Sequence, residues 1–565
     1  MKKMQYNFTV KIPTETKKIA FQKQKDVVYV LYETERVYSP AKKYTYPKRT
    51  MIGRRCPEDP ELMYPNDNFF IYFPGQTMPE EHDQVERSCC LKIGNYIVIK
   101  QILQEQGLDQ ILLDRFGSQS GLFQDFVSYL IVEEDNAAQH YPDYAYNHPL
   151  FTVGMRVLSD STISKLLKET SEEQIQGVLD DWNAKQDKKE RIYISYDSTN
   201  KNSQAGDIDI LEFGKAKDEK GLPIFNLSLA FNCTNEKPLF YEQYPGSIND
   251  VSQFKFVVDK ALEYGYRRIG FILDRGYFSK SNIQYMDDNG YAFVMMVKGC
   301  KALVRGLIDE VRGTFETDRQ FNIRHHHLNA ITLQRPLFSA EKKLRYIHLY
   351  FSHQKMADDR AEIEDKLEEM MAEYQKYVGK EVNFSEGHER YFDFHFDKQG
   401  RFQFASEKVE VIQKELEWCG YFAIVTSEKM SAEDAYCLYK GRDSSEKLFR
   451  ADKTFLGCKS MRVASLKAMS TKMLLEFIAL IVRNRMYVLL RDETKKLSAR
   501  KNFMTVPAAI RELEKIEMVR LSNSHYRLDH AVTRTQQTIL NAFGISVEDI
   551  REQATQIAQA VAVNQ

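Results

Sequence analysis

Apolar and polar positions follow two different periods over the first 188 residues of the chain. Residues 1–85 hold short strand-like runs, such as Val27–Tyr32 and Phe69–Phe73, between turns rich in Pro, Asn and Gly. Residues 86–188 show helical spacing instead. The pattern therefore predicts a small, partly β N-terminal module followed by a helical domain.

Two neighbouring segments of the helical domain have the length of a helical hairpin. Val157–Lys168 and Glu172–Trp182 are separated by a short polar connection. Such a pair fits a DNA-binding helix-turn-helix, although most short helical hairpins have no DNA-binding role. Residues 86–188 are thus a candidate DNA-binding domain, with a purely structural hairpin as the alternative.

From residue 189 the pattern changes to that of an α/β domain. Three strand-like runs come first, and two helices then alternate with two more strands, in the order β-β-β-α-β-α-β. This order predicts a mixed sheet of three antiparallel and two parallel strands, with helices on its faces. The runs are strands Ile192–Tyr196, Ile208–Phe213 and Phe225–Asn232, helix Asp250–Tyr264, strand Arg268–Leu273, helix Ser279–Asp288 and strand Ala292–Val297.

The α/β pattern is interrupted over residues 301–415. A long charged helix, Gln354–Val378, lies there between the strand-like runs Leu344–Phe351 and Arg390–Phe396. We therefore expect an inserted α+β module. Strand Tyr421–Thr426 then resumes the domain. The remaining segments are the second part of the α/β domain, residues 416–495, and a C-terminal region, residues 496–565, whose last clear helix is Gln536–Phe543.

The net charge of the whole chain does not indicate a binding partner, but the charge of two of its segments does. The whole chain has 79 Lys and Arg against 80 Asp and Glu. Residues 1–55, however, hold 14 basic and 4 acidic side chains, and residues 438–472 hold 9 and 3. Two basic segments within a neutral chain indicate a positioned site for a polyanion.

Cysteine usage and hydropathy indicate the compartment. The eight cysteines are scattered, without a C-x-x-C pair or a preceding signal peptide, which is typical of a protein of the reducing cytoplasm. The most apolar run, Met473–Leu490, contains Glu476, Arg483 and Arg485. Since those charges would be costly in a bilayer, the run predicts a buried helix and no membrane partner.

The most informative motif is Y-x2-R-x3-E-x6-K, formed by Tyr439, Arg442, Glu446 and Lys453 in a stretch with helical spacing. At about 100° per residue, these offsets place the four side chains within roughly 60° on one face of a single helix. A carboxylate can hold a hard divalent cation, while the other three side chains can donate to phosphate oxygens. A solvated amphipathic helix is the alternative, but chance should give this spacing on the order of once in a hundred such chains.

Two aspartates upstream could complete a metal site with Glu446. Asp197 closes the first predicted strand and Asp274 closes the fourth. Carboxylates at the ends of neighbouring strands can share two divalent ions about 3.5 to 4 Å apart, as in two-metal phosphoryl transfer. Taken singly, an Asp after a strand is more often a turn residue or a helix cap. The third carboxylate, on a downstream helix, favours the metal site.

With Asp197, Asp274 and Glu446 in this order, on the first strand, the fourth strand and a late helix, the chain resembles the DDE transposases of bacterial insertion sequences. Its Y-x2-R-x3-E-x6-K motif is similar to the signature of the insertion-sequence-four superfamily, the YREK group. The resemblance implies an RNase H-like catalytic core with a mixed sheet and accessory terminal domains. The core would comprise residues 189–300 and 416–495, with residues 301–415 as its insertion.

The resemblance also implies roles for individual residues. Asp197, Asp274 and Glu446 would be the catalytic residues and the ligands of two Mg²⁺ ions, or of Mn²⁺ in their place. The other residues expected to contact DNA are Tyr439, Arg442, Lys453, Arg275, which follows the second acid, and Lys298, which follows a central strand.

The implied activity is DNA cleavage and strand transfer by two-metal phosphoryl transfer, without a covalent protein intermediate. The partners would be the transposon ends and target DNA. The N-terminal region would bind the terminal inverted repeats, and two protomers would pair the two ends as a homodimer. The protein would work in the bacterial cytoplasm, on the nucleoid.

Two other functions use the same residues. An RNase H-like nuclease would cut nucleic acid without joining it, because three carboxylates serve either reaction. A domesticated DNA-binding protein would bind without catalysis, but an intact acidic triad is unusual for such a protein. The terminal modules and the Tyr, Arg and Lys of the motif favour transposition.

Overall fold

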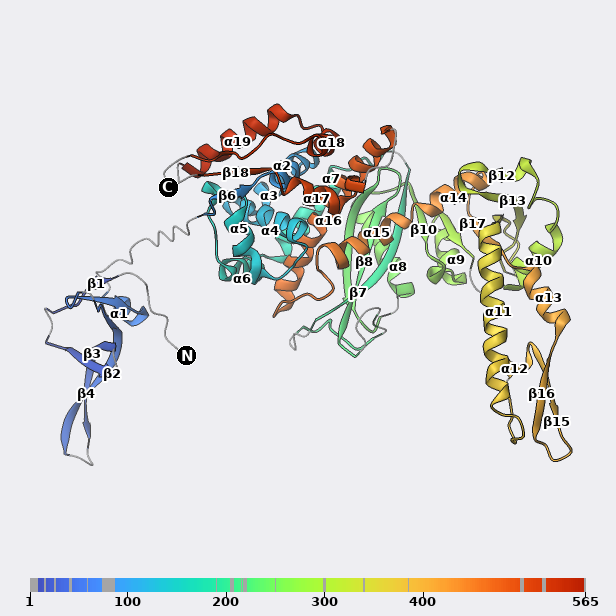
Figure 1. Cartoon of the computed structure of the whole chain (residues 1–565), viewed down its shortest axis with the longest axis horizontal. Helices are drawn as coiled ribbons and strands as arrows, with labels where there is room; N and C mark the ends of the chain where they lie inside the picture. Colours follow the sequence, from blue (N-terminus) through green and yellow to red (C-terminus); the bar gives the residue numbers. More distant parts are fainter. Residues whose placement is uncertain are drawn as a thin grey trace. The chain divides into compact units, whose positions relative to one another are not determined.

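The chain folds into two compact units, residues 1–85 and 86–565 (Figure 1). Each unit has its own hydrophobic core. The computed structural model describes residues 9–14, 17–24, 27–39, 43–57, 59–73, 87–189, 191–203, 208–214, 216, 221–248, 250–297, 301–338, 341–384, 386–497, 502–520 and 525–562.

The first unit is a five-stranded antiparallel sheet with one helix, in the strand order β1-β5-β4-β3-β2. The predicted run Val27–Tyr32 lies in β3, but Phe69–Phe73 belongs to helix α1 and its C-terminal cap instead of a strand. Asn66 caps that helix, and Phe69 fills the small core, which explains the helical turn. The elements are β1 (Val10–Lys11), β2 (Ile19–Gln24), β3 (Val27–Ser39), β4 (Tyr44–Arg55), β5 (Leu62–Pro65) and α1 (Asp67–Tyr72).

A nine-stranded mixed sheet lies at the centre of the second unit, in the order β12-β13-β14-β17-β11-β10-β7-β8-β9. Strands β7, β10 and β11 run parallel, while β8 and β9 continue the sheet in antiparallel fashion. These five strands form the predicted RNase H-like core, and every residue of β10 is buried because both faces of the sheet are covered. The core elements are β7 (Ile192–Asn202), β8 (Ile224–Asn232), β9 (Lys237–Pro245), α8 (Asp250–Glu263), β10 (Ile269–Leu273), α9 (Lys280–Asp288), β11 (Ala292–Met296) and β17 (Tyr421–Thr426).

Two strand assignments from the sequence are wrong. Residues 208–213 contain only an isolated bridge from Glu212 to Ile224, and the third strand of the core is β9. Prolines in and at the end of β9 argue against a central strand, but β9 lies at the edge of the sheet, where proline is tolerated. Strand β7 also continues beyond Asp197, so this aspartate lies within a strand instead of closing it.

The expected insertion, residues 301–415, is not a separate module throughout. Its first half extends the central sheet, because β14 pairs with β17 from Tyr346 and Thr426 to Phe351 and Tyr421. Residues 353–417, here called the arm, project from the sheet with a core of their own (Figure 1). The elements are α10 (Lys301–Val311), β12 (Asn322–Ile323), β13 (Leu328–Arg335), β14 (Arg345–Phe351), α11 (His353–Gln375), α12 (Glu386–Glu389), β15 (Phe392–Phe396), β16 (Phe402–Glu407) and α13 (Val409–Glu417).

Helix α16 (Leu466–Lys496) joins the sheet to a helical layer. It contains the predicted buried run and is apolar around most of its middle, so neighbours cover it on all sides. Helices from both before and after the sheet in sequence pack on it. A small sheet of β6, β18 and β19 also joins the two segments. Among the described residues, no helix is long and apolar enough to cross a membrane.

The helical layer therefore combines residues 86–188 with the C-terminal region. A C-terminal helix, α19, was missed by the sequence interpretation, although Ile550, Ala554, Ile557 and Val561 recur at helical spacing. The elements are β6 (Cys90–Lys92), α2 (Gly94–Gln106), α3 (Leu108–Phe116), α4 (Ser120–Glu133), α5 (Tyr141–Asn147), α6 (Asp160–Glu169), α7 (Glu172–Ala184), α17 (Val506–Leu513), β18 (Glu517–Val519), β19 (Arg527–Leu528), α18 (Arg534–Ala542) and α19 (Val547–Ala562).

The candidate helix-turn-helix corresponds to α6 and α7. One face of α7, with Val178, Leu179 and Trp182, is buried, and the Trp182 indole N–H donates to the Pro238 carbonyl at 3.0 Å. Helix α7 contacts the edge strand β9 and helix α16. Helix α3 also packs on α7, with Arg115 paired to Asp181, so only the remaining exposed side chains of α7 could contact a DNA partner.

Candidate active site

Asp197 and Asp274 lie side by side on neighbouring parallel strands. The parallel pairing of β7 with β10 ends at Tyr196 and Leu273. Asp197 is the next residue of β7, and Asp274 directly follows β10. Residues in register on adjacent strands are about 4.8 Å apart and point to the same face of the sheet. Both aspartates are half-buried, and the Asp197 carboxylate accepts a hydrogen bond from the Ser198 N–H at 2.8 Å. The sheet thus places two carboxylates at one point of its surface.

Arg442 links Glu446 to Asp274 by two ion pairs. The Arg442 guanidinium lies 3.1 Å from the Asp274 carboxylate and 2.7 Å from that of Glu446. The Arg442 side chain is 16% exposed, whereas those of Asp274 and Glu446 are 32% and 51% exposed. One partly buried cation therefore bridges two carboxylates that both remain accessible to solvent.

The electrostatics of Arg442 place Asp197 in the same cluster. Burial by itself would lower the pKa of Arg442, but the surrounding negative groups outweigh burial and raise that pKa above its ordinary value. The groups that raise it are Tyr439, Asp274, Glu446 and Asp197. The Arg442 guanidinium thus contacts Asp274 and Glu446 directly and is also stabilised by the negative charge of Asp197.

This set of donors fits a hard divalent cation. All three predicted ligands are carboxylates, which Mg²⁺ and Mn²⁺ prefer over nitrogen or sulfur. Their partial exposure leaves room for water and substrate oxygens, which Mg²⁺ retains in its coordination sphere. Asp197, Asp274 and Glu446 are therefore the residues that would hold the metal.

The predicted single helix of the Y-x2-R-x3-E-x6-K motif is divided into three segments. Tyr439 lies in α14 (Ala432–Lys440), Glu446 in α15 (Asp443–Arg450), and Lys453 in a π-helical turn, Ala451–Phe455. Arg442 lies at the break between α14 and α15. The wider π turn changes the angular spacing after Arg450, so the four side chains do not share one regular helix face.

Gly441 accounts for the position of the break between α14 and α15. A Cβ atom at this residue would lie 2.9 Å from the Leu438 carbonyl oxygen and 3.1 Å from the Cys233 sulfur. Cys233 directly follows strand β8. The missing side chain lets the helix approach the sheet closely, and Arg442 is the next residue.

Tyr439 is a packing residue in this structure. Its side chain belongs to a buried cluster with Ile272, Val294 and Ile424, and its ring centre is 5.5 Å from the Arg442 guanidinium carbon. Stacking on an aromatic face stabilises a cation. Tyr439 thus supports the guanidinium that links the carboxylates.

The other predicted DNA contacts are only partly described. Lys453 is half-buried in the π turn. The backbone of Arg275 begins the 3₁₀ turn Arg275–Tyr277 directly after Asp274. Lys298 lies outside the described residues.

A second cluster of charges, which the sequence interpretation missed, lies further along β7. The Lys201 ammonium is 2.7 Å from the Asp452 carboxylate and 2.6 Å from that of Glu476, and all three side chains are 0 to 1% exposed. Burial by itself would lower the pKa of Lys201, but the two carboxylates raise it above its ordinary value. Glu476 was the available signal, because a charge within an apolar helix requires a buried partner.

This buried cluster also resembles a metal site. Ligand atoms of Asp452, Cys458 and Glu476 lie within 4.8 Å of one another. The Lys201 ammonium, however, contacts both carboxylates and supplies the positive charge that a metal would supply. We therefore assign the cluster a structural role. Its ion pairs connect the π turn and α16 to β7, the strand that carries Asp197.

Comparison with known proteins gives two findings. A protein-family model for the transposase DDE domain matches residues 188–482, slightly more than half of the chain. Among solved structures, the cryo-EM structure of a piggyBac transposase synaptic complex with hairpin DNA is similar over 82% of this chain and 82% of that chain, with 9% identity and a TM-score of 0.35. No curated protein sequence matches the chain.

Proposed function

The chain belongs to the transposase DDE domain family, and on this premise we propose that it cuts DNA at the terminal inverted repeats of an insertion sequence and joins the freed ends to other DNA. The order of Tyr439, Arg442, Glu446 and Lys453 further supports membership of the insertion-sequence-four superfamily and its YREK group. The observation that carries the proposal is the convergence of Asp197, Asp274 and Glu446 on Arg442.

The three carboxylates and Arg442 have different roles in the proposed mechanism. Asp197, Asp274 and Glu446 hold the divalent cations, Mg²⁺ or Mn²⁺. When bound, such ions polarise the scissile phosphate and lower the pKa of a coordinated water. Arg442 keeps Asp274 and Glu446 together before DNA arrives and offsets part of their mutual repulsion.

The reaction consists of two phosphoryl transfers. Water attacks the phosphorus at the element end, loses a proton, and displaces a 3′ oxygen, which leaves as a 3′-hydroxyl. That hydroxyl then attacks a second phosphodiester, in the opposite strand or in target DNA, and displaces its 3′ oxygen. No protein atom becomes covalently attached to DNA.

DNA contacts would come from both units. Lys453, which follows Glu446 by seven residues, Arg275, which follows Asp274 directly, and Lys298 would bind the backbone near the cleaved bond. In the N-terminal unit, Tyr38, Tyr44 and Tyr46 are exposed on strands β3 and β4, whose side chains include Lys48 and Arg49. Basic and aromatic side chains together favour nucleic-acid binding, so this unit would bind the inverted repeats of paired ends in a homodimer.

A strand-transfer assay tests the proposal. The substrate is a labelled duplex with the inverted repeat that brackets the reading frame, incubated with target DNA and Mg²⁺. We expect cleaved ends and products joined to target. Cleavage without joining under any divalent metal would instead indicate a nuclease, and binding without cleavage would indicate a domesticated DNA-binding protein.

A further inference from the structure

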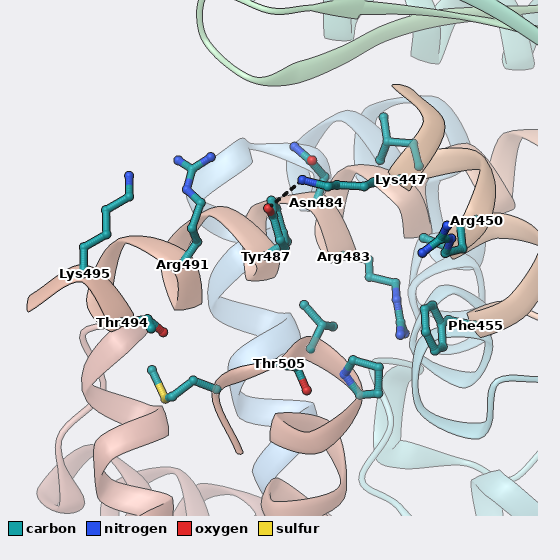
Figure 2. Close-up of a pocket in the computed structure, with 15 residues that line it drawn as sticks. Lys447, Arg450, Phe455, Arg483, Asn484, Tyr487, Arg491, Thr494, Lys495 and Thr505 are labelled. Carbon is teal, nitrogen blue, oxygen red and sulfur yellow. Dashed lines mark hydrogen bonds between the residues drawn. The ribbon is translucent and has the colours of Figure 1, made fainter. Parts of the chain in front are cut away.

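A cavity of about 630 Å³ opens beside the catalytic helix, between α15, α16 and the start of α17 (Figure 2). Its volume lies within the range of small-molecule sites, and its wall is mainly apolar. Helix α15 contributes Lys447 and Arg450, and α15 also carries Glu446. Glu446 and Arg450 are four residues apart, or about 6 Å along the helix axis. The cavity therefore lies about one helical turn from Glu446.

The charges around this cavity are of one sign. Of the lining residues that the structure describes, five are Lys or Arg and none is Asp or Glu. Three of the five are paired with acids outside the cavity: Arg491 with Glu236, Arg483 with Glu134, and Lys495 with Asp492. An anion is the ligand that such a lining favours.

Lys447 and Arg450 are the two cations with capacity for a ligand. Lys447 donates to the Tyr487 hydroxyl at 3.1 Å and has no carboxylate partner among the described residues. Arg450 is exposed and makes no hydrogen bond or ion pair within the described part of the chain. Both side chains can therefore donate to phosphate oxygens, and a guanidinium can do so with two parallel bonds.

The apolar wall suits a planar ring. It includes the rings of Phe455 and Tyr487 and the side chains of Val506 and Pro507. Nucleic-acid bases stack favourably on aromatic side chains, whatever the base. An apolar wall with phosphate donors at one side is complementary to a nucleotide.

We propose that this cavity binds a single nucleotide, with its phosphate at Lys447 and Arg450 and its base against the apolar wall. The nucleotide can come from two sources: a free nucleoside phosphate, or an unpaired nucleotide of a DNA strand near the cleaved bond. The second source rests on the proposed function, whereas the first does not.

Thr505 provides a variant that fills the cavity without changing its charge. It is exposed, lies across the cavity from Lys447 and Tyr487, and occupies the N-cap of α17 without a side-chain capping bond (Figure 2). Thr505→Trp should therefore block the base while leaving α17 folded, which thermal unfolding can verify. Arg450→Ala removes a phosphate donor. Arg551→Ala on α19, whose partner Glu548 is 3.9 Å away, is the matched control for loss of a surface arginine.

The test measures binding to the full-length protein without divalent metal. The probes are free dAMP, a blunt duplex, and the same duplex with a short unpaired 3′ overhang. We expect wild type to bind dAMP or to prefer the overhang over the blunt end. Thr505→Trp should abolish whichever signal is present, Arg450→Ala should weaken it about tenfold, and Arg551→Ala should leave it unchanged.

The outcomes distinguish a free nucleotide from a nucleotide of a DNA strand, and they decide whether the cavity binds a nucleotide at all. A dAMP signal lost in Thr505→Trp identifies a free nucleotide, and an overhang preference lost in the same variant identifies a strand nucleotide. Neither signal in wild type, or signals that persist in Thr505→Trp, would overturn the proposal. Equal losses on blunt and overhang duplexes in Arg450→Ala would also overturn it, by reducing Arg450 to a general phosphate contact. Mg²⁺-dependent cleavage of the blunt duplex tests the proposed function separately.

Discussion

Strand β7 contributes to two clusters of acids that differ in one physical respect. Asp197 joins Asp274, Glu446 and the Arg442 guanidinium, while Lys201, four residues later on the same strand face, joins Asp452 and Glu476. In the first cluster the acidic side chains retain access to solvent, with Glu446 51% exposed. In the second, all three charged side chains are fully buried.

The difference shows that proximity of carboxylates does not by itself make a catalytic metal site. The buried acids are close enough to hold an ion, but the Lys201 ammonium already contacts Asp452 and Glu476, and their side chains are closed off from the protein surface. A metal that acts on DNA needs open coordination positions. Because the acids of the exposed cluster are accessible to solvent, we propose that cluster as the catalytic metal site and give the buried cluster a structural role.

The largest expected effect is on catalysis by Glu446. Glu446→Gln removes a ligand charge while keeping the shape of the side chain, so DNA cleavage should fall by roughly 10³-fold or more. Because this side chain is half exposed, the unfolding midpoint and DNA affinity should barely change. Glu548→Gln, at an exposed position of α19, is the control. Cleavage at the wild-type rate would show that the assigned acid is wrong.

Lys201→Met should lower the free energy of unfolding, because Lys201 belongs to the buried cluster and not to the proposed catalytic site. It would leave two buried carboxylates without a counter-charge, which costs about 3–5 kcal/mol of unfolding free energy in comparable cases. Denaturant unfolding measures this loss. The triple variant with Asp452→Asn and Glu476→Gln should recover much of it, and Lys495→Met, at a surface pair, should cost little. A loss below about 1 kcal/mol would contradict the buried pairing.

A variant of Arg442 tests the role of the cation in the exposed cluster. Arg442→Gln should lower cleavage roughly 10- to 100-fold, because Asp274 and Glu446 lose the group that positions them. It should also tighten Mn²⁺ binding in the absence of DNA, since a guanidinium no longer competes for the carboxylates. Titration of bound Mn²⁺ measures this, with Arg462→Gln as the control. Weaker Mn²⁺ binding in Arg442→Gln would count against this competition.

A smaller effect should appear in the pH dependence of stability. Burial raises the pKa of Asp452 to about 6 from an ordinary 3.8, against the opposing charge of Lys201. The folded protein therefore keeps this proton longer than the unfolded chain, and the associated stability is lost as pH rises from about 4 to 6. Between about pH 4 and 6, the free energy of unfolding of wild type should fall relative to that of Asp452→Asn. Above about pH 6, the two free energies should change with pH in parallel. Parallel curves throughout would contradict the raised pKa.

Much of the core was predictable because its elements are local patterns. Helices α8 and α9 and strands β10 and β11 match the sequence interpretation to within about one residue, because apolar runs and turn residues delimit them. Asp197 and Asp274 follow from the same patterns. Strand β9 was missed because its prolines are acceptable only at a sheet edge, a position that depends on the whole sheet.

The buried cluster lay beyond sequence reasoning for a different reason. Lys201 is separated from Asp452 by 251 residues and from Glu476 by 275, and no local period connects them. The π turn that carries Lys453 is likewise set by tertiary contacts, including the tie between Asp452 and Lys201. The acids of the site and Arg442 could be named from the sequence, whereas the ion pairs of Arg442 with Asp274 and Glu446 could not. Lys201 and its two ion pairs were not predicted at all.

The most direct test of the central claim is the anomalous scattering of Mn²⁺ in crystals of the protein bound to its DNA end. We expect anomalous density among the carboxylates of Asp197, Asp274 and Glu446. Density among Asp452, Cys458 and Glu476, with none at the first three, would contradict it.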